Sequence, residues 1–131
     1  MTNNSEARNN AFILLFECVF QSEPDRAEVL RLAEENHEIA LDEFALNLFH
    51  GVLDHQSELD RTIAQYCKKR TPDRLSKMLL TVLRMAVYEI ENVDTPTAVV
   101  INEAVNLIKT YDSPEAAAYG NGVLGSYVRE R

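Results

Sequence analysis

Seven lysine and arginine side chains fall between residues 61 and 84, where a single acidic residue accompanies them. Such a concentration of positive charge can bind a polyanion, for example the backbone of a nucleic acid. The whole chain carries a net charge of −8, so at long range it would repel the same ligand. A second interpretation stays open and is the simpler one: the cations belong to a solvated helix end and complement its dipole. The seven residues are Arg61, Lys68, Lys69, Arg70, Arg74, Lys77 and Arg84.

A glycine-rich run, GNGVLG at residues 120–125, has the G-x-G-x-x-G spacing of a phosphate-binding loop. A dinucleotide site of that kind needs a strand before the run and an acidic residue about 20 positions after it. Three alanines precede this run and only six residues follow it, so we do not expect nucleotide binding. Small residues within a helix instead let a neighbouring backbone approach, and Asn121 supplies a donor and an acceptor for a hydrogen bond.

The three histidines, His37, His50 and His55, lack the spacing of a metal site. His50 and His55 would point about 140° apart around a helix, because each residue advances by roughly 100°. No segment pairs a nucleophile with a base and a third, orienting group. We therefore expect a protein that is not an enzyme and that holds neither a metal nor a cofactor.

Two charged residues interrupt otherwise apolar helical patterns: Arg84 within residues 79–87, and Glu103 within residues 99–105. Burying a charge costs free energy unless the charge meets a partner. We therefore expect Arg84 and Glu103 to form an ion pair between neighbouring helices.

Apolar residues recur every three or four positions along the chain, and no segment alternates as a half-buried strand does. A hydroxyl residue followed by proline marks a helix start at Thr71-Pro72, Thr95-Pro96 and Ser113-Pro114. Gly51 suggests a break within a long helical pattern. With 131 residues, the chain suits one domain. We predict an all-α protein, a helical bundle of about seven helices.

The longest apolar run, residues 11–20, contains Glu17 and is shorter than the roughly 20 residues that cross a bilayer. The first residues do not have the basic flank, apolar stretch and cleavage site of a secretory signal. Cys18 and Cys67 lie within apolar helical patterns, as buried thiols do in a reducing compartment. We expect a cytoplasmic protein with no membrane partner.

Three segments carry a recognisable pattern: LRMAVYEI at 83–90, TP at 95–96 followed by VVINEAV at 99–105, and YGNGVL at 119–124. In order and spacing they resemble the C-terminal half of the NusB family. Ala7-Arg8, followed by Ala11 and Phe16, is similar to the first helix of that family. The resemblance implies a single NusB-like domain over residues 1–131 with two small subdomains, about 1–70 and 71–131. It also implies a bacterial transcription antitermination factor without catalytic activity.

The resemblance further implies partners and site residues. Members of the family bind the boxA segment of ribosomal-RNA leader transcripts, together with the small-subunit ribosomal protein NusE, and join an RNA-polymerase antitermination complex. By resemblance we expect Arg8, Glu115 and Tyr119 near single-stranded boxA RNA, and Phe16 near NusE. We add Asn121 to the RNA side. An arginine binds phosphates, and an aromatic ring stacks on unpaired bases.

Two departures from the family pattern lower the expected affinity for RNA. Family members often carry several arginines before Arg8, where this chain has Asn3-Asn4-Ser5-Glu6, and a basic residue often stands where this chain has Ala118. Each phosphate contact that is lost weakens binding. NusE, or the basic segment 61–84, would have to compensate.

An alternative function therefore stays open: a helical protein-interaction or dimerisation module of the same fold, with weak or lost RNA binding. The first helical segment favours self-association, because its apolar residues exceed what one helix face can bury. We accordingly keep a homodimer as a possible assembly. The residues concerned are Phe12, Ile13, Leu14 and Phe20.

Overall fold

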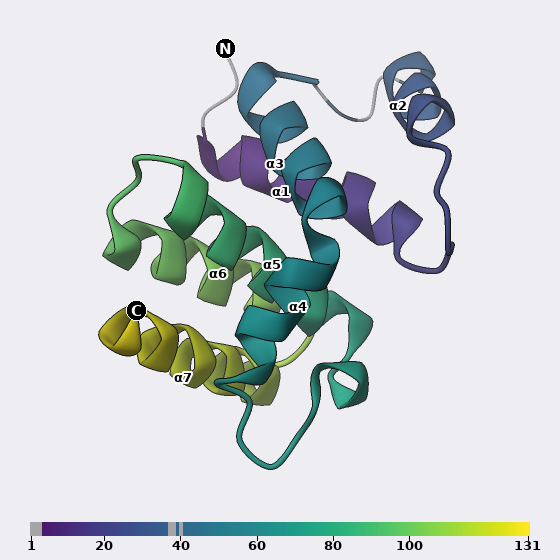
Figure 1. Ribbon diagram of the computed structural model, residues 1–131. Coiled ribbons are helices and arrows are strands. Elements are labelled where there is room, and N and C mark those ends of the chain that lie inside the picture. The colour runs from purple at the N-terminus through teal and green to yellow at the C-terminus, as the bar shows by residue number, and fades with distance from the viewer. Residues whose placement is uncertain (1–3, 37–38, 40) are drawn as a thin grey trace.

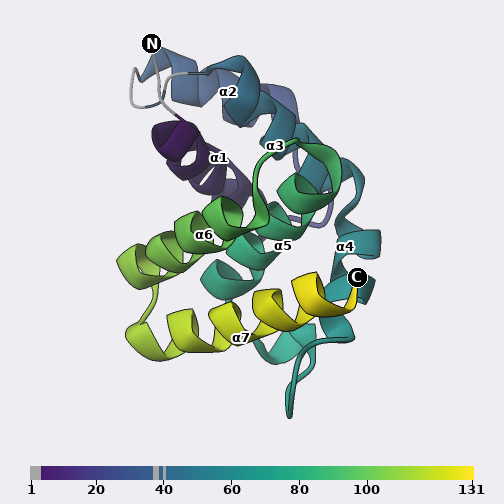
Figure 2. The same cartoon turned by 90° about the vertical axis from the view of Figure 1, so that its left-hand side faces the viewer.

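The computed structural model describes residues 4–36, 39 and 41–131, and over these residues the chain is helical with no strand (Figures 1 and 2). His37 lies outside the described residues. The predicted all-α class and the predicted number of helices are confirmed. In chain order the elements are α1 Asn4–Cys18, α2 Arg26–Glu35, α3 Glu43–Asp54, α4 Gln56–Ala64, the 3₁₀ helix η1 Pro72–Arg74, α5 Lys77–Asn92, α6 Thr97–Tyr111 and α7 Pro114–Glu130.

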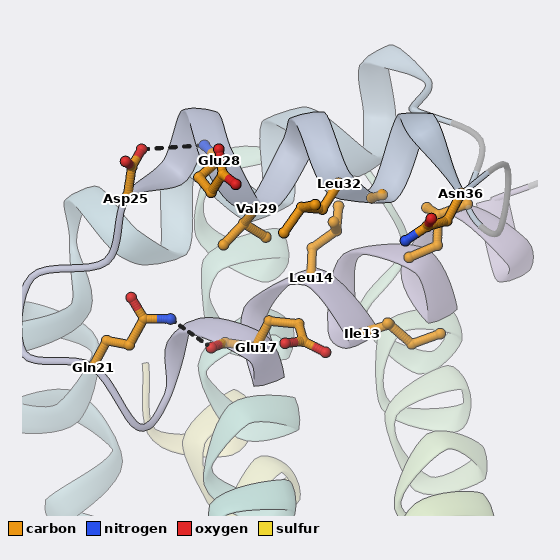
Figure 3. Close-up of a pocket in the computed structure, with 11 residues that line it drawn as sticks. Ile13, Leu14, Glu17, Gln21, Asp25, Glu28, Val29, Leu32 and Asn36 are labelled. Carbon is orange, nitrogen blue, oxygen red and sulfur yellow. Dashed lines mark hydrogen bonds between the residues drawn. The ribbon is translucent and has the colours of Figure 1, made fainter.

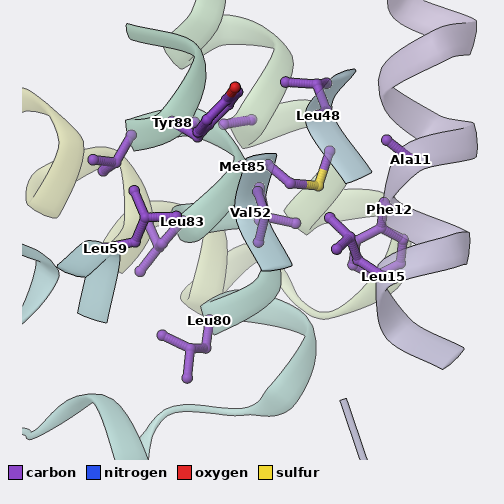
Figure 4. Packing of buried hydrophobic residues seen from close by; sticks show 14 of the residues in the cluster. Ala11, Phe12, Leu15, Leu48, Val52, Leu59, Leu80, Leu83, Met85 and Tyr88 are labelled. Carbon is purple, nitrogen blue, oxygen red and sulfur yellow. The ribbon is translucent and has the colours of Figure 1, made fainter. Parts of the chain in front are cut away.

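Helix α5 forms the centre of the molecule. It packs against α1, α3, α4, α6 and α7, and every residue from Leu79 to Ile90 is buried. Side chains from α1, α3 and α4 meet those of α5 in one continuous core, as Phe12, Val52 and Leu83 illustrate (Figure 4). The division of the chain into halves near residue 70 stays a prediction, because α5 packs on helices from both sides of that boundary.

The helix starts follow from local hydrogen bonds. The hydroxyl of Ser113 accepts from the backbone N–H of Ala116, with Pro114 at the first helical position, as predicted. Thr71-Pro72 starts only η1, and Ser76 caps α5 instead. Pro96 itself precedes α6 and gives it no side-chain cap.

The break in the long helical pattern falls at His55, between α3 and α4, and the suggested break at Gly51 is wrong. Gly51 is buried, and a Cβ atom built there would lie only 2.1 Å from Cζ of Tyr88. Its small size therefore lets the aromatic ring of Tyr88, on α5, cross α3 closely.

The apolar residues of α1 exceed one face because three helices, α2, α3 and α5, pack against it. Phe12 and Leu14 are buried and Ile13 is partly buried. The expectation that they lie exposed for self-association is wrong. Phe20, just beyond the end of α1, is 70% exposed. A homodimer stays a prediction without that support.

The expected pair of Arg84 with Glu103 is also wrong. Arg84 binds Asp60 on α4 through two hydrogen bonds, of 2.7 and 2.9 Å. Glu103, on α6, instead lies 3.4 Å from Arg8 and accepts a hydrogen bond from Ser5. Burial does require a partner for each charge, but helical periodicity does not say which neighbouring helix the side chain faces.

Candidate nucleic-acid interface

Tyr119, on α7, contacts the loop that follows α4. Its side chain is partly buried, and its hydroxyl donates a hydrogen bond of 3.2 Å to the backbone carbonyl of Lys68. The loop projects from the molecule next to α7 (Figures 1 and 2). The basic segment and the predicted stacking residue, which are about 50 residues apart in the sequence, are therefore in direct contact.

The guanidinium of Arg70 lies over the ring of Tyr119, 5.5 Å from its centroid. An arginine on an aromatic face forms a cation–π contact, and its plane is itself a surface on which a base can stack. Arg70 is exposed, so a base that approaches from this side meets the guanidinium first. No motif or periodicity in the sequence predicts that Arg70, in a loop, lies over Tyr119.

The hydroxyl of Tyr119 also contacts the thiol of Cys67. Burial raises the pKa of the Tyr119 hydroxyl, and burial likewise raises the pKa of the Cys67 thiol. Both groups are consequently neutral near pH 7. The hydroxyl keeps its proton, which it donates to the Lys68 carbonyl, and this hydrogen bond fixes the ring at the surface.

Two hollows lie along α7, and Tyr119 lines one of them. One, of about 260 Å³, runs along α7 past Tyr119 and includes Lys68 and Arg129. The other, of about 600 Å³, lies between α6 and α7 and includes Asn102, Lys109 and Asn121. Ala118 lines both, so the two hollows meet at its exposed side chain.

The hollow between α6 and α7 combines an apolar floor with polar edges. Ile101 and Val105 line it together with the side-chain amides of Asn102 and Asn121. An amide offers both donors and an acceptor, which is the chemistry that reads the edge of an unpaired base. Asn102 and Lys109 were missed as site residues, although their spacing of seven places both on one face of a helix.

A third hollow, of about 570 Å³, lies in the loop itself and is lined by Lys69, Arg70, Thr71 and Arg74. The cations of this hollow are exposed. Lys69 has a positive φ of 65°, a conformation that a residue with a side chain seldom adopts. The loop backbone therefore adopts an uncommon conformation at one of the residues that line this hollow.

Arg8 does not lie at this surface, which corrects its predicted role. Its side chain is buried, and its guanidinium binds the Glu89 carboxylate. α1 and α7 lie on opposite sides of α5 and α6 (Figure 2). Arg8 therefore serves to pair a buried acid, and we do not carry it further as an RNA contact.

The other predicted residues are at the surface to different degrees. Glu115 is exposed in the first turn of α7, one helical turn before Tyr119, and Asn121 is exposed further along the helix. Phe16 is partly buried on α1. It stacks on Phe12 at 5.7 Å and meets Phe20 edge to face at 5.4 Å between ring centroids.

A separate groove of about 240 Å³ lies between α1 and α2 (Figure 3). Leu14, Val29 and Leu32 line it, and carboxylates such as Glu17 and Asp25 stand at its edge. Because those carboxylates repel phosphates, this groove does not suit a nucleic acid. No group of three metal-ligating side chains occurs within residues 4–36, 39 and 41–131.

Comparison with known proteins then identifies the family. The model of the NusB family matches residues 5–129. The chain belongs to the NusB family. Members of this family are transcription antitermination factors, and they are not enzymes. The transcription antitermination protein NusB of Limosilactobacillus reuteri is 35% identical over 98% of this chain and 94% of its own length. The NusB protein of Symbiobacterium thermophilum is 41% identical over 83% of this chain and 68% of its own length.

Solved structures share the fold. The T. maritima NusB structure has a TM-score of 0.84 at 28% identity, over 99% of this chain and 93% of its own. A chain in the crystal structure of a plectonemic RNA supercoil has a TM-score of 0.86 at 26% identity, over 98% and 96%. A third match is to the structure of antitermination factors NusB and NusE in complex with dsRNA, with a TM-score of 0.84 at 24% identity over 98% of this chain and 97% of that chain. At this identity the match shows a shared fold only. In the part of the chain that the structure describes, no helix is both long and apolar enough to span a bilayer.

Proposed function

We propose that this NusB-family protein binds single-stranded boxA-type leader RNA of ribosomal-RNA transcripts together with NusE, as part of an RNA-polymerase antitermination complex in the cytoplasm. The observation that supports it best is the continuity of the α7 surface. The amide-lined hollow between α6 and α7 meets the hollow at Tyr119 through Ala118, and the cations of the loop lie beside that ring.

This arrangement suits an unpaired RNA strand. Amides bind the edges of bases, an aromatic ring with an arginine over it provides a stacking surface, and neighbouring cations attract phosphates. On this surface we assign Tyr119 to stacking and Asn121 to hydrogen bonding. Glu115, one turn away, borders the RNA site and accepts hydrogen bonds from donors on the RNA.

For NusE we propose the aromatic end of α1. Phe16 is partly covered, while Phe20 beside it is 70% exposed and offers an apolar surface to a protein partner. The fold is compatible with both partners, because a structure of the same fold contains NusB with NusE and dsRNA.

One observation favours the alternative, an interaction module with weak RNA binding. Arg8 is buried in an ion pair and leaves no N-terminal arginine for phosphates among the described residues. If RNA affinity has been lost, the aromatic end of α1 would still bind a protein partner.

Titration of a labelled boxA oligonucleotide, with and without NusE, separates the two functions. We expect Tyr119→Leu to weaken RNA binding about tenfold, because base stacking on an aromatic ring contributes about 1–3 kcal/mol. Phe20→Ala should leave RNA binding by the chain alone unchanged and weaken NusE binding. If the wild-type protein gives no RNA signal, alone or with NusE, the proposed RNA-binding function is wrong and the protein-interaction module is favoured.

A further inference from the structure

The loop between α4 and α5 concentrates charge within seven residues, Lys68–Arg74, which we call the basic loop. Its four cations, Lys68, Lys69, Arg70 and Arg74, are all exposed. The loop contains one acidic residue, Asp73, whose carboxylate accepts a hydrogen bond from the Thr71 hydroxyl. That hydrogen bond lowers the pKa of Asp73, and the nearby charges of Arg74 and Lys77 add to the effect. The loop therefore keeps a net positive charge of about three near pH 7.

We propose that the basic loop is a phosphate-binding element, which holds the backbone of the same RNA strand whose base stacks at Tyr119. The inference rests on the proposed function and adds to it the source of the positive charge. In this chain the loop would supply the phosphate contacts that the first residues lack.

The shape of the loop supports a binding role. Its hollow of about 570 Å³ is lined by Lys69, Arg70, Thr71 and Arg74, so three cationic residues border one space. Ammonium and guanidinium groups are the usual donors to phosphate, and an arginine can bind two phosphate oxygens at once. The positive φ of Lys69 costs conformational energy, which is commonly retained at positions with a function.

The basic loop is also joined to the stacking residue. Lys68 accepts the hydrogen bond of the Tyr119 hydroxyl, and Arg70 covers the Tyr119 ring. A strand that follows the α6–α7 hollow past Ala118 thus reaches the ring and then the cations without leaving the surface.

Two features favour RNA over an acidic protein surface as the occupant. The surface that Arg70 and Tyr119 form is suited to the stacking of bases, and an acidic peptide has no base to place there. The charge is also segregated: residues 1–60 carry thirteen acidic and three basic side chains, so the basic loop is the part of an acidic molecule to which a polyanion is drawn.

The test is the salt dependence of RNA binding. Lys69→Asn and Arg74→Gln each remove one charge, and asparagine tolerates the positive φ at position 69. For each variant we expect the slope of log K against log salt concentration to become shallower by about 0.7, and by about 1.4 for the double variant. The loss of affinity should be severalfold at low salt and should shrink as salt is added.

Arg31→Gln is the matched control, because it removes the same charge from the exposed face of α2. Thermal unfolding of every variant should match that of the wild type, since all three side chains are exposed. An equal change of slope in Arg31→Gln, or an unchanged slope in the double variant, would overturn the inference while RNA binding itself stands. A double variant that loses NusE affinity but keeps its RNA slope would assign the loop to an acidic protein and also overturn it. If wild-type protein binds no RNA with or without NusE, the proposed function and this inference fall together.

Discussion

Arg8 and Glu89 are 81 residues apart in the sequence, and their side chains form two hydrogen bonds of 2.8 and 2.6 Å within the core. Glu89 is 2% exposed and Arg8 is 5% exposed. The guanidinium also lies 3.4 Å from Glu103 and 5.2 Å from the centroid of Phe44. One arginine thereby ties α1 to α3, α5 and α6. Glu89 raises the pKa of Arg8 through this hydrogen bond, so the guanidinium stays charged.

We expect Arg8→Ala to lower the free energy of unfolding by about 3–5 kcal/mol, because it leaves the buried Glu89 carboxylate without its cation. Urea unfolding at pH 7 measures the effect. Arg31→Ala is the control, since its ion pairs with Glu28 and Glu35 are exposed, and it should leave stability nearly unchanged. If Arg8→Ala were as stable as the wild type, the burial of Arg8 in an ion pair with Glu89 would be contradicted.

The pairing of Arg84 can be tested with a double-mutant cycle. Arg84→Ala combined with Asp60→Ala should show a coupling energy of about 1–3 kcal/mol, because the two side chains share two hydrogen bonds. Arg84→Ala combined with Glu103→Ala should be additive within about 0.5 kcal/mol. A large coupling in the second cycle and none in the first would contradict the structure.

These pairs show what the sequence predicts and what it does not. Periodicity identified the helices, and burial of charge identified Arg84 and Glu103 as residues that need partners. The partners depend on how helices pack. Arg84 and Glu89 point about 140° apart around α5, so they meet different neighbours, and only the three-dimensional arrangement assigns Asp60 and Arg8 to them.

The same limit applies to the candidate interface. The family resemblance singled out Tyr119, the glycine-rich run singled out Asn121, and composition singled out the basic segment. Their contact depends on the path of a loop, in which Lys68 and Arg70 reach the ring of Tyr119. Loop conformation has no periodic signal, so the sequence left open whether these cations were only a solvated helix end.

Gly120 and Gly122 of α7 provide a matched pair of substitutions. A Cβ atom at Gly120 would lie 2.7 Å from Cδ1 of the buried Ile108, so Gly120→Ala should destabilise the protein by about 1–3 kcal/mol. A Cβ atom at Gly122 meets nothing within 4 Å, and Gly122→Ala should stabilise the helix by up to about 1 kcal/mol. Urea unfolding of both variants checks the opposite signs, and equal effects would mean that Gly120 is not tightly packed.

The raised pKa of the Tyr127 hydroxyl predicts that the folded protein loses stability at alkaline pH. Burial, together with its hydrogen bond of 2.7 Å to Glu91, raises the pKa of its hydroxyl above the ordinary value of 10. The folded state then keeps a proton that the unfolded state releases, so above about pH 10 stability falls as pH rises, by at most about 1.4 kcal/mol per pH unit. Tyr127→Phe should fall less steeply between pH 9 and about 11 in urea unfolding. Buried Cys18, whose pKa is also raised by burial, is present in both proteins and does not affect the difference. Parallel pH profiles would show that the hydroxyl ionises freely.

Ala118 offers a gain-of-function test of the RNA surface. Its exposed side chain stands where the two hollows of α7 meet, so a cation there would lie beside any strand that crosses from Asn121 to Tyr119. We expect Ala118→Lys to tighten binding of a boxA oligonucleotide severalfold at low salt and to steepen the slope of log K against log salt concentration by about 0.7, the value for one added phosphate contact on a single strand. Ala118→Gln, of similar length but uncharged, should change neither quantity. Tighter binding by both variants would indicate an effect of side-chain size, and an unchanged slope for the lysine variant would place the RNA elsewhere on the molecule.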